Sequence, residues 1–315
     1  MKIYSFPARS TMKVAEDMMI KLQRFNLPDG YMGVWNPNIF SRTRYKWVYY
    51  VVEWVLSDNE VVQLNNFPKP LIPCSNWAKF LSRNYKYPAV RHEVNHEFAK
   101  APIRESPEKF DFISISYNLV RKTPAVLLKY INMYNKRYKG VIIADLSVCN
   151  QIKNPLVKCI GFGSLDETTL KNLMYNSSVM LNLTGLEGFG LPALEMTYLG
   201  KPVISNPIPP YLEYHYVDMY TIPFRYVKMY PLYQSGTLHP TILPRPEYLD
   251  EYFKFINDMI EKARNGERDN ALDASVNYVR RNLTGGREYS KIVTILANEG
   301  LIGEKVIKNV TVMYR

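Results

Sequence analysis

The segment LNLTGLEGFGLPALEMTYLGKPVIS, residues 181–205, has the clearest pattern of secondary structure in the chain. It reads as a strand, a loop, a helix, a turn and a second strand, because apolar runs flank the glycine-containing centre. Gly188 and Gly190 allow the backbone to approach a ligand, and Pro192 suits the first turn of a helix. Backbone amides at a helix start attract an anion, so this order of elements predicts a phosphate site.

Two glutamates belong to this loop and helix. Glu187 lies just before the expected helix and Glu195 lies about one turn inside it, so both can line one cleft. A carboxylate accepts hydrogen bonds from two adjacent sugar hydroxyls. Taken alone, such a pair is more often two solvated carboxylates. The Gly-Phe-Gly-Leu-Pro between them and the Gly-Lys-Pro-Val-Ile after them favour a binding site.

As a block, these residues resemble the Glu-x7-Glu signature of the family-4 retaining glycosyltransferases. The stretch IGFGSLDETTL, residues 160–170, resembles the strand, turn and helix that precede the signature in that family. Residues 110–140 resemble its first C-domain strand and helix. Within them, Arg121-Lys122-Thr123 matches the family's Arg-Lys-Gly, whose lysine binds the donor pyrophosphate. Residues 1–100 resemble the family only loosely.

The resemblance implies the GT-B fold, an α/β architecture in which two Rossmann-like domains with parallel sheets face a central cleft. The alternation of strand-like and helix-like pieces along the chain favours the same class. We expect residues 1–103 to form an acceptor-side domain, with a C-terminal helix in 287–315 packing back onto it. Residues 104–286 are expected to bind the nucleotide sugar, and Phe98–Glu108 is expected to be a linker.

Hydrophobic periodicity gives the expected elements. Strands are expected at 2–6, 47–52, 71–73, 89–91, 110–116, 140–145, 157–161, 179–183 and 202–205. Helices are expected at 12–25, 75–82, 124–135, 165–175, 191–199, 250–264, 272–282 and 287–299. The tyrosine- and proline-rich segment 211–248 fits either an aromatic-lined groove or interdomain packing with a rigid loop.

The activity that the resemblance implies is a retaining, metal-independent hexosyltransferase, which moves a sugar from a nucleotide-diphosphate sugar to an acceptor hydroxyl. The expected catalytic residues are Glu187, which would hold the sugar hydroxyls, Lys122, which would stabilise the leaving diphosphate, and Glu53, which would lie near the transferred sugar. A solvated lysine and a strand-end carboxylate are the alternatives for Lys122 and Glu53. The expected donor-binding residues are Glu195, on the ribose, together with Gly188, Phe189, Gly190, Leu191, Lys122 and Arg121.

The donor is expected to be the only small molecule required, with no separate cofactor. The sequence has no Asp-x-Asp and no His, Cys and Asp cluster at metal-binding spacing, so no metal site is expected. The acceptor would be a glycan, a lipid or a protein.

Two departures from the family pattern keep other functions open. Arg9-Ser10-Thr11 stands where the family has paired glycines, and Ser116 stands where it has an arginine. Arg9 or Arg121 would then have to supply the missing charge. One alternative is therefore a non-catalytic relative that binds a nucleotide or a glycan.

The charge of the chain suggests anionic partners. With 40 lysines and arginines against 29 aspartates and glutamates, the formal net charge is +11. A nucleic-acid-binding protein is the second alternative, although nucleic acid is the less favoured partner. Basic clusters such as Arg42-Thr43-Arg44-Tyr45-Lys46 suggest peripheral docking on an anionic membrane, with scattered solubilising lysines as the alternative.

Localisation is expected to be cytoplasmic, or peripheral at the membrane. No window approaches the roughly 18 uninterrupted apolar residues of a membrane-spanning helix, and the first residues resemble a strand rather than a signal sequence. Cys74, Cys149 and Cys159 are odd in number and lack zinc-site spacing. Free, mostly buried thiols in a reducing compartment are therefore expected.

Overall fold

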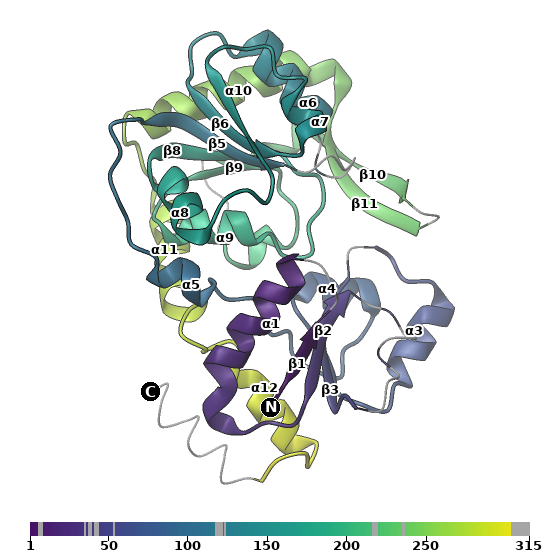
Figure 1. Cartoon of the computed structure of the whole chain (residues 1–315). Coiled ribbons are helices and arrows are strands. Elements are labelled where there is room, and N and C mark those ends of the chain that lie inside the picture. Colours follow the sequence, from purple (N-terminus) through teal and green to yellow (C-terminus); the bar gives the residue numbers. More distant parts are fainter. Residues whose placement is uncertain are drawn as a thin grey trace. The chain divides into compact units, whose positions relative to one another are not determined.

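The structure is a computed structural model that describes residues 1–5, 9–34, 36, 40, 44–52, 54–116, 122, 124–215, 220–234 and 237–303. The chain divides into two compact units. The first is Met1–His96 together with the segment that begins at Arg280, and the second is Glu97–Val279. Both boundaries fall a few residues before those expected from the sequence. Each unit is built on a parallel sheet (Figure 1).

The first unit has a four-stranded parallel sheet in the order β1-β2-β3-β4. Its strands are β1 (Ile3–Ser5), β2 (Gly30–Val34), β3 (Trp47–Val51) and β4 (Leu71–Pro73). All five residues of β3 are buried, as expected for a strand covered on both faces. A Cβ on Gly30 would lie 2.3 Å from the ring of Trp47, its partner on β3, so this register requires a glycine.

The helices of the first unit follow its strands in a βα pattern (Figure 1). Helix α1 (Arg9–Leu22) follows β1, and α4 (Asn76–Ser82) follows β4 with Ser75 as its N-cap. Helix α3 (Asp58–Asn65) begins with a capping box, in which Ser57 and Glu60 satisfy each other's backbone amides. Helix α12 (Ser290–Asn298) belongs to this unit although it lies near the end of the sequence.

A buried carboxylate attaches the segment before α12 to the first unit. Glu93 accepts hydrogen bonds from the amides of Gly286, Glu288 and Tyr289 at 2.6, 2.7 and 3.3 Å. The ammonium of Lys21 lies 3.1 Å from Glu93 and 2.7 Å from Asp17. Burial raises the pKa of the Asp17 carboxyl to about 6, against the opposing effect of Lys21. The cluster therefore joins α1, residue 93 and the C-terminal segment through charges that water barely reaches.

The second unit has a five-stranded parallel sheet in the order β7-β6-β5-β8-β9. Its strands are β5 (Phe110–Ser116), β6 (Gly140–Ala144), β7 (Val157–Gly161), β8 (Ser177–Asn182) and β9 (Val203–Ser205). The chain starts on the central strand, fills one side, and then crosses to fill the other. The strand order therefore reverses between β5 and β8, and ligands of doubly wound sheets bind at such a point, at the carboxyl ends of the strands.

Helices surround the sheet of the second unit (Figure 1). They are α6 (Pro124–Lys129), α7 (Leu146–Cys149), α8 (Glu167–Tyr175), α9 (Leu191–Tyr198), α10 (Leu249–Arg264) and α11 (Asn270–Asn282). The short helix α5 (His96–Lys100) begins at the boundary between the two units. Much of the tyrosine- and proline-rich segment forms an antiparallel hairpin of β10 (Val227–Gln234) and β11 (Thr237–Pro244). This hairpin extends beyond the parallel sheet of its own unit (Figure 1).

Some expected elements differ in the structure. Residues 89–91 form no strand, although the amide of Val90 donates to the carbonyl of Pro73 at 2.9 Å. The expected linker Phe98–Glu108 begins inside helix α5, because the Lys171 ammonium donates to the carbonyls of Ala99 and Ala101 and holds that turn against α8. The sequence patterns also did not predict β2, α3, α7 or the hairpin.

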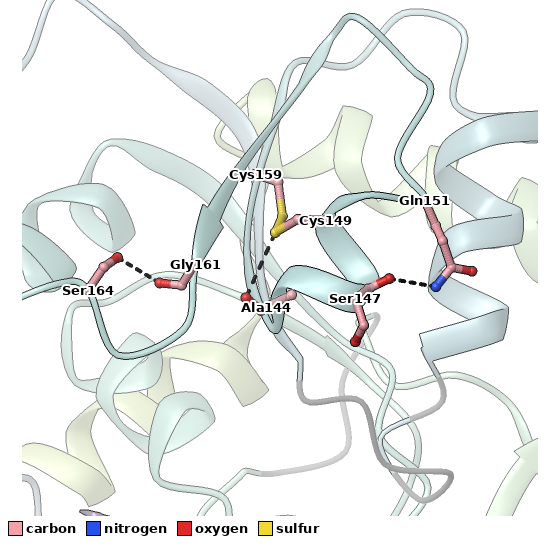
Figure 2. Close-up of a disulfide and its surroundings, with 7 residues drawn as sticks. All are labelled: Ala144, Ser147, Cys149, Gln151, Cys159, Gly161 and Ser164. Carbon is pink, nitrogen blue, oxygen red and sulfur yellow. Dashed lines mark hydrogen bonds between the residues drawn. A yellow bond between two sulfur atoms is a disulfide. The ribbon is translucent and has the colours of Figure 1, made fainter.

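The expectation of three free thiols is wrong for two of them. Cys149, at the end of α7, and Cys159, in β7, form a disulfide with their Cα atoms 5.5 Å apart (Figure 2). The short connection from α7 to the edge strand β7 brings the two side chains together, and an odd total number of cysteines does not exclude one pair. Cys74 is free and buried.

We expect reduction of this disulfide to lower the free energy of unfolding by about 2–3 kcal/mol, because opening a short loop returns entropy to the unfolded chain. Urea unfolding with and without a phosphine reductant measures the difference. The double variant Cys149→Ser/Cys159→Ser is the control and should not respond to reductant. Identical wild-type curves in the two conditions would contradict the prediction.

Candidate functional site

The candidate site lies where the strand order of the second unit reverses. A small pocket at this point is lined by residues at the carboxyl ends of β5 and β8 and by residues that follow them: Ser114, Ile115, Ser116, Lys122, Leu127, Asn182, Leu183 and Thr184. Ser116, which stands where the resembled family has an arginine, is buried in this lining. The fold therefore directs one lysine and several hydroxyl and amide groups to the edge where a doubly wound sheet binds ligands.

Lys122 and Glu187 are in direct contact in this site. The Lys122 ammonium donates to Oε1 of Glu187, and the two side chains are 11% and 10% exposed. Lys122 follows β5, and Glu187 lies in the loop that follows β8, so neighbouring strands bring together residues far apart in sequence. A buried pair of this kind is costly to desolvate, which makes it weak evidence for stability. The contact places a cation and a carboxylate together beside the point where the strand order reverses.

The loop reaches helix α9 through Gly190, the residue before its first turn. Gly190 has φ +86°, in the left-handed region that glycine favours, and Pro192 lies in the first turn. A Cβ at residue 190 would lie 2.1 Å from the Tyr211 ring. The first-turn amides of an α-helix have no partner within the helix, so this start offers donors for an anion.

Gly190→Ala is expected to lower the free energy of unfolding by at least about 2 kcal/mol. The alanine would have to adopt a left-handed backbone conformation, and its Cβ would clash with the Tyr211 ring. The matched control is Gly161→Ala, where the added Cβ would meet its nearest neighbour, Leu146, at an ordinary 3.7 Å. Thermal unfolding of the two variants measures the difference. Equal stabilities would show that the loop adapts to a side chain at residue 190.

Glu195 lies within α9, in a run of buried residues from Ala193 to Thr197. Its side chain is buried together with that of Glu187 in the same loop and helix. A carboxylate in such surroundings needs hydrogen bonds or a counter-charge to offset its desolvation. Its position fits a group that accepts hydrogen bonds from a polar ligand.

Tyrosine and asparagine side chains hold the loop in place. The Tyr214 hydroxyl, at 2.9 Å from the Gly190 carbonyl and 3.3 Å from that of Phe189, bonds the last residues before α9. The Asn206 amide donates to the carbonyls of Leu183 and Thr184 at 3.1 and 2.9 Å. Burial raises the pKa of Tyr214 far above its usual value, and the negative charge of Glu187 adds to this effect. Tyr214 therefore stays a neutral hydrogen-bond donor.

The hairpin contributes to the same support. The amide of Ile242 on β11 donates to the Gly185 carbonyl at 2.8 Å, and a Cβ on Gly185 would lie 2.4 Å from the Ile242 carbonyl oxygen. No local sequence pattern identifies these supporting contacts. The one signal for them in the sequence is the density of tyrosines in 211–248. Tyr211 and Tyr214 are buried, and the Tyr211 ring lies against Gly190.

Most of the expected site residues occupy this one loop and its neighbours. Lys122, Glu187, Gly188, Phe189, Gly190, Leu191 and Glu195 are all described, and all belong to the second unit. Glu53 and Arg121 lie outside the described residues, as does the side chain of Arg9. Nothing in the structure therefore bears on their expected roles.

The described residues bear on three expectations: the lack of a metal site, the lack of a membrane-spanning helix, and the basic cluster 42–46. Among these residues, no three His, Cys, Asp or Glu side chains gather as metal ligands would. None of the described helices is both long and apolar enough to cross a membrane. Of the basic cluster 42–46, Arg42 is outside the described residues, Lys46 is exposed, and Arg44 lies over the Tyr4 ring at 4.3 Å.

Comparison by sequence finds nothing: no model of a protein family and no curated protein matches the chain. Comparison of structures does find similar proteins. HepE of Anabaena, solved with UDP, aligns over 95% of this chain and 100% of its own, with 12% identity and a TM-score of 0.61. A glycosyltransferase from Rickettsia africae aligns over 98% of each chain, with 13% identity and a TM-score of 0.58.

Sucrose-phosphate synthase of Thermosynechococcus elongatus aligns over 93% of this chain and 80% of its own, with 12% identity and a TM-score of 0.60. At such low identity the likeness is one of fold. The chain has the GT-B type of α/β fold with two Rossmann-like units, which confirms the fold class expected from the sequence.

Proposed function

We propose that this chain is a glycosyltransferase that takes a sugar from a nucleotide-diphosphate sugar. The observation that carries the proposal is the buried contact of Lys122 with Glu187 where the strand order reverses, beside the start of α9. Two solved proteins of similar fold support it: HepE was crystallised with UDP-glucose, and the pneumococcal O-GlcNAc transferase GtfA with UDP and GlcNAc. Both are similar to this chain in fold alone.

In this proposal the second unit binds the donor and the first unit lies on the acceptor side. The ammonium of Lys122 and the amides around Phe189, Gly190 and Leu191 attract the diphosphate, with Arg121 as a further cation. Glu195 accepts hydrogen bonds from the ribose hydroxyls. Glu187 accepts hydrogen bonds from the sugar hydroxyls while its contact with Lys122 keeps both groups oriented.

The proposed reaction breaks the bond between the anomeric carbon and the β-phosphate oxygen. The acceptor hydroxyl oxygen forms its bond to the same carbon on the face that the diphosphate leaves, so the configuration is retained. The proton of that hydroxyl passes to an oxygen of the departing diphosphate. The chain contributes mainly orientation and stabilisation of the charge that develops on the leaving group, and Lys122 is the proposed source of that stabilisation.

The finer parts of the proposal follow from this chemistry. Because a lysine and helix-start amides stabilise the diphosphate, the reaction needs neither a divalent metal nor a separate cofactor. Glu53 is proposed near the transferred sugar. The acceptor is a glycan, or a lipid or protein that the basic chain reaches in the cytoplasm or at an anionic membrane surface.

The test is release of nucleoside diphosphate from UDP-, GDP-, ADP- and dTDP-sugars, followed by mass spectrometry with and without an added acceptor mixture. We expect release from one donor class, faster with acceptor, and a product whose anomeric proton coupling matches that of the donor. Binding of a nucleotide sugar without release would instead indicate a non-catalytic relative. Affinity for nucleic acid that falls steeply with salt, with no donor binding, would favour the nucleic-acid alternative.

A further inference from the structure

A second cavity lies in the first unit, between residues 86–88 and helix α12. Its volume is about 300 Å³, at the small end of the range for small-molecule sites. The polar residues of its lining are Lys86, Tyr87, Lys291, Thr294, Asn298 and Glu299. The last four lie on or next to α12 at positions that share one face of the helix, so a single helix presents them together.

The position of this cavity separates it from the edge where a Rossmann-like sheet binds its ligand. The Asn84 side chain donates to the carbonyl of Leu71, the first residue of β4, at 3.0 Å. It also accepts from the amide of Lys86 at 3.3 Å. The segment 86–88 therefore begins at the amino end of the parallel sheet, whereas nucleotides bind at the carboxyl end.

The charges around the cavity balance one another. The Lys86 ammonium lies 3.3 Å from the Glu299 carboxylate, and the Lys291 ammonium lies 2.6 Å from that of Glu288. An anionic ligand would gain little from lysines that are already neutralised, and it would meet the carboxylate of Glu299. A neutral ligand avoids that repulsion and can use the ammonium, carboxylate, amide and hydroxyl groups as donors and acceptors.

Tyr87 belongs to this lining as a residue that is only 6% exposed, and the Lys86 ammonium lies 4.9 Å from its ring centre. Burial raises the pKa of its hydroxyl, and side-chain hydrogen bonding with Lys86 and Glu299 also acts on that pKa. In the described chain, neither of these contacts has regular hydrogen-bond geometry. A ligand hydroxyl beside these three groups would give the Tyr87 hydroxyl a well-aligned partner.

We propose that this cavity is a saccharide-binding subsite, which holds one neutral sugar ring. Its size fits a ring, its paired ammonium and carboxylate groups suit adjacent hydroxyls, and the Tyr87 ring adds an apolar surface. The subsite does not depend on donor binding in the second unit. It would hold a glycan by a residue other than the one that reacts.

Saturation-transfer NMR tests the proposal with methyl glycosides of glucose, galactose, mannose and N-acetylglucosamine on the full chain. Thr294→Trp fills the cavity from an exposed position of α12. Ala274→Trp makes the matched change at an exposed position of α11, away from the cavity. Tyr87→Phe removes only the hydroxyl, and inorganic phosphate serves as the anionic probe.

We expect at least one glycoside to bind in the millimolar range, as is common for a ligand of this size. Thr294→Trp should abolish its signal, Tyr87→Phe should weaken it about tenfold, and Ala274→Trp should leave it unchanged. Binding of none of the glycosides, equal binding to Thr294→Trp, or displacement of the glycoside by phosphate would overturn the proposal. Because no donor is present, none of these results depends on the proposed transferase activity.

Discussion

Lys122→Ala is expected to lower the rate of sugar transfer about 100- to 1000-fold, the usual effect of removing one group that stabilises developing charge. The ammonium of Lys122 lies against Glu187 at the switch point, where the proposed reaction leaves negative charge on the diphosphate. Binding of the free nucleoside, which lacks phosphate, should change little. Steady-state release of nucleoside diphosphate and titration with the nucleoside measure the two effects.

A folding defect must be separated from a loss of chemistry, because removing Lys122 leaves Glu187 buried without its counter-charge. Such a loss costs about 3–5 kcal/mol of stability in buried pairs. The double variant Lys122→Ala/Glu187→Gln removes both charges, so it should recover stability without recovering turnover. Lys158→Ala, at an exposed lysine of β7, is the matched control and should keep the wild-type rate. Loss of nucleoside and donor binding to the same extent would indicate general misfolding instead.

Glu93→Ala is expected to lower the free energy of unfolding by about 3–5 kcal/mol. The Glu93 carboxylate accepts hydrogen bonds from three backbone amides of the segment before α12 and forms an ion pair with Lys21. Removing it leaves those amides without their acceptor and shifts the charge balance of Lys21 and Asp17. Urea unfolding followed by circular dichroism measures the loss.

The matched control for Glu93 is Glu16→Ala, at an exposed position on α1. It should change stability by less than about 0.5 kcal/mol, as surface substitutions usually do. If Glu93→Ala does not fold, Glu93→Gln keeps one acceptor oxygen and should give an intermediate loss. A stability close to that of Glu16→Ala would show that the C-terminal segment is held by its apolar contacts alone.

The parallel sheet of the second unit and most of its helices could be predicted because their signals are local. Strands β5 and β7 have the bounds that their apolar runs predict, and α9 differs from its expected range by one residue. Gly188 and Gly190 before α9 and Pro192 in its first turn indicate a loop that leads into a helix, and the positive φ of Gly190 agrees with this. Hydrophobic periodicity therefore predicts the helices and strands, and their alternation predicts the class of fold.

Features that depend on distant parts of the chain could not be predicted. The contact between Lys122 and Glu187 depends on β5 and β8 being neighbours in the sheet. No local sequence pattern predicts which strands are neighbours. Tyr214, whose hydroxyl supports the loop before α9, follows the next strand, β9, in the sequence. It belongs to a segment whose composition is compatible with several structures. The disulfide likewise depends on how α7 returns to the sheet edge. By contrast, the capping box of α3, at Ser57 and Glu60, is a local signal from which this helix could have been predicted.

In the proposed function, the loop and helix from Glu187 to Glu195 bind a nucleoside diphosphate. The most direct test is calorimetric titration of the wild-type chain and of Glu195→Ala with UDP, GDP, ADP and dTDP. We predict that one diphosphate binds the wild type with one site per chain. Glu195→Ala should weaken that binding about 10- to 100-fold, the loss expected for hydrogen bonds to a charged acceptor. Absence of binding by every diphosphate, or an unchanged dissociation constant in Glu195→Ala, would contradict the claim.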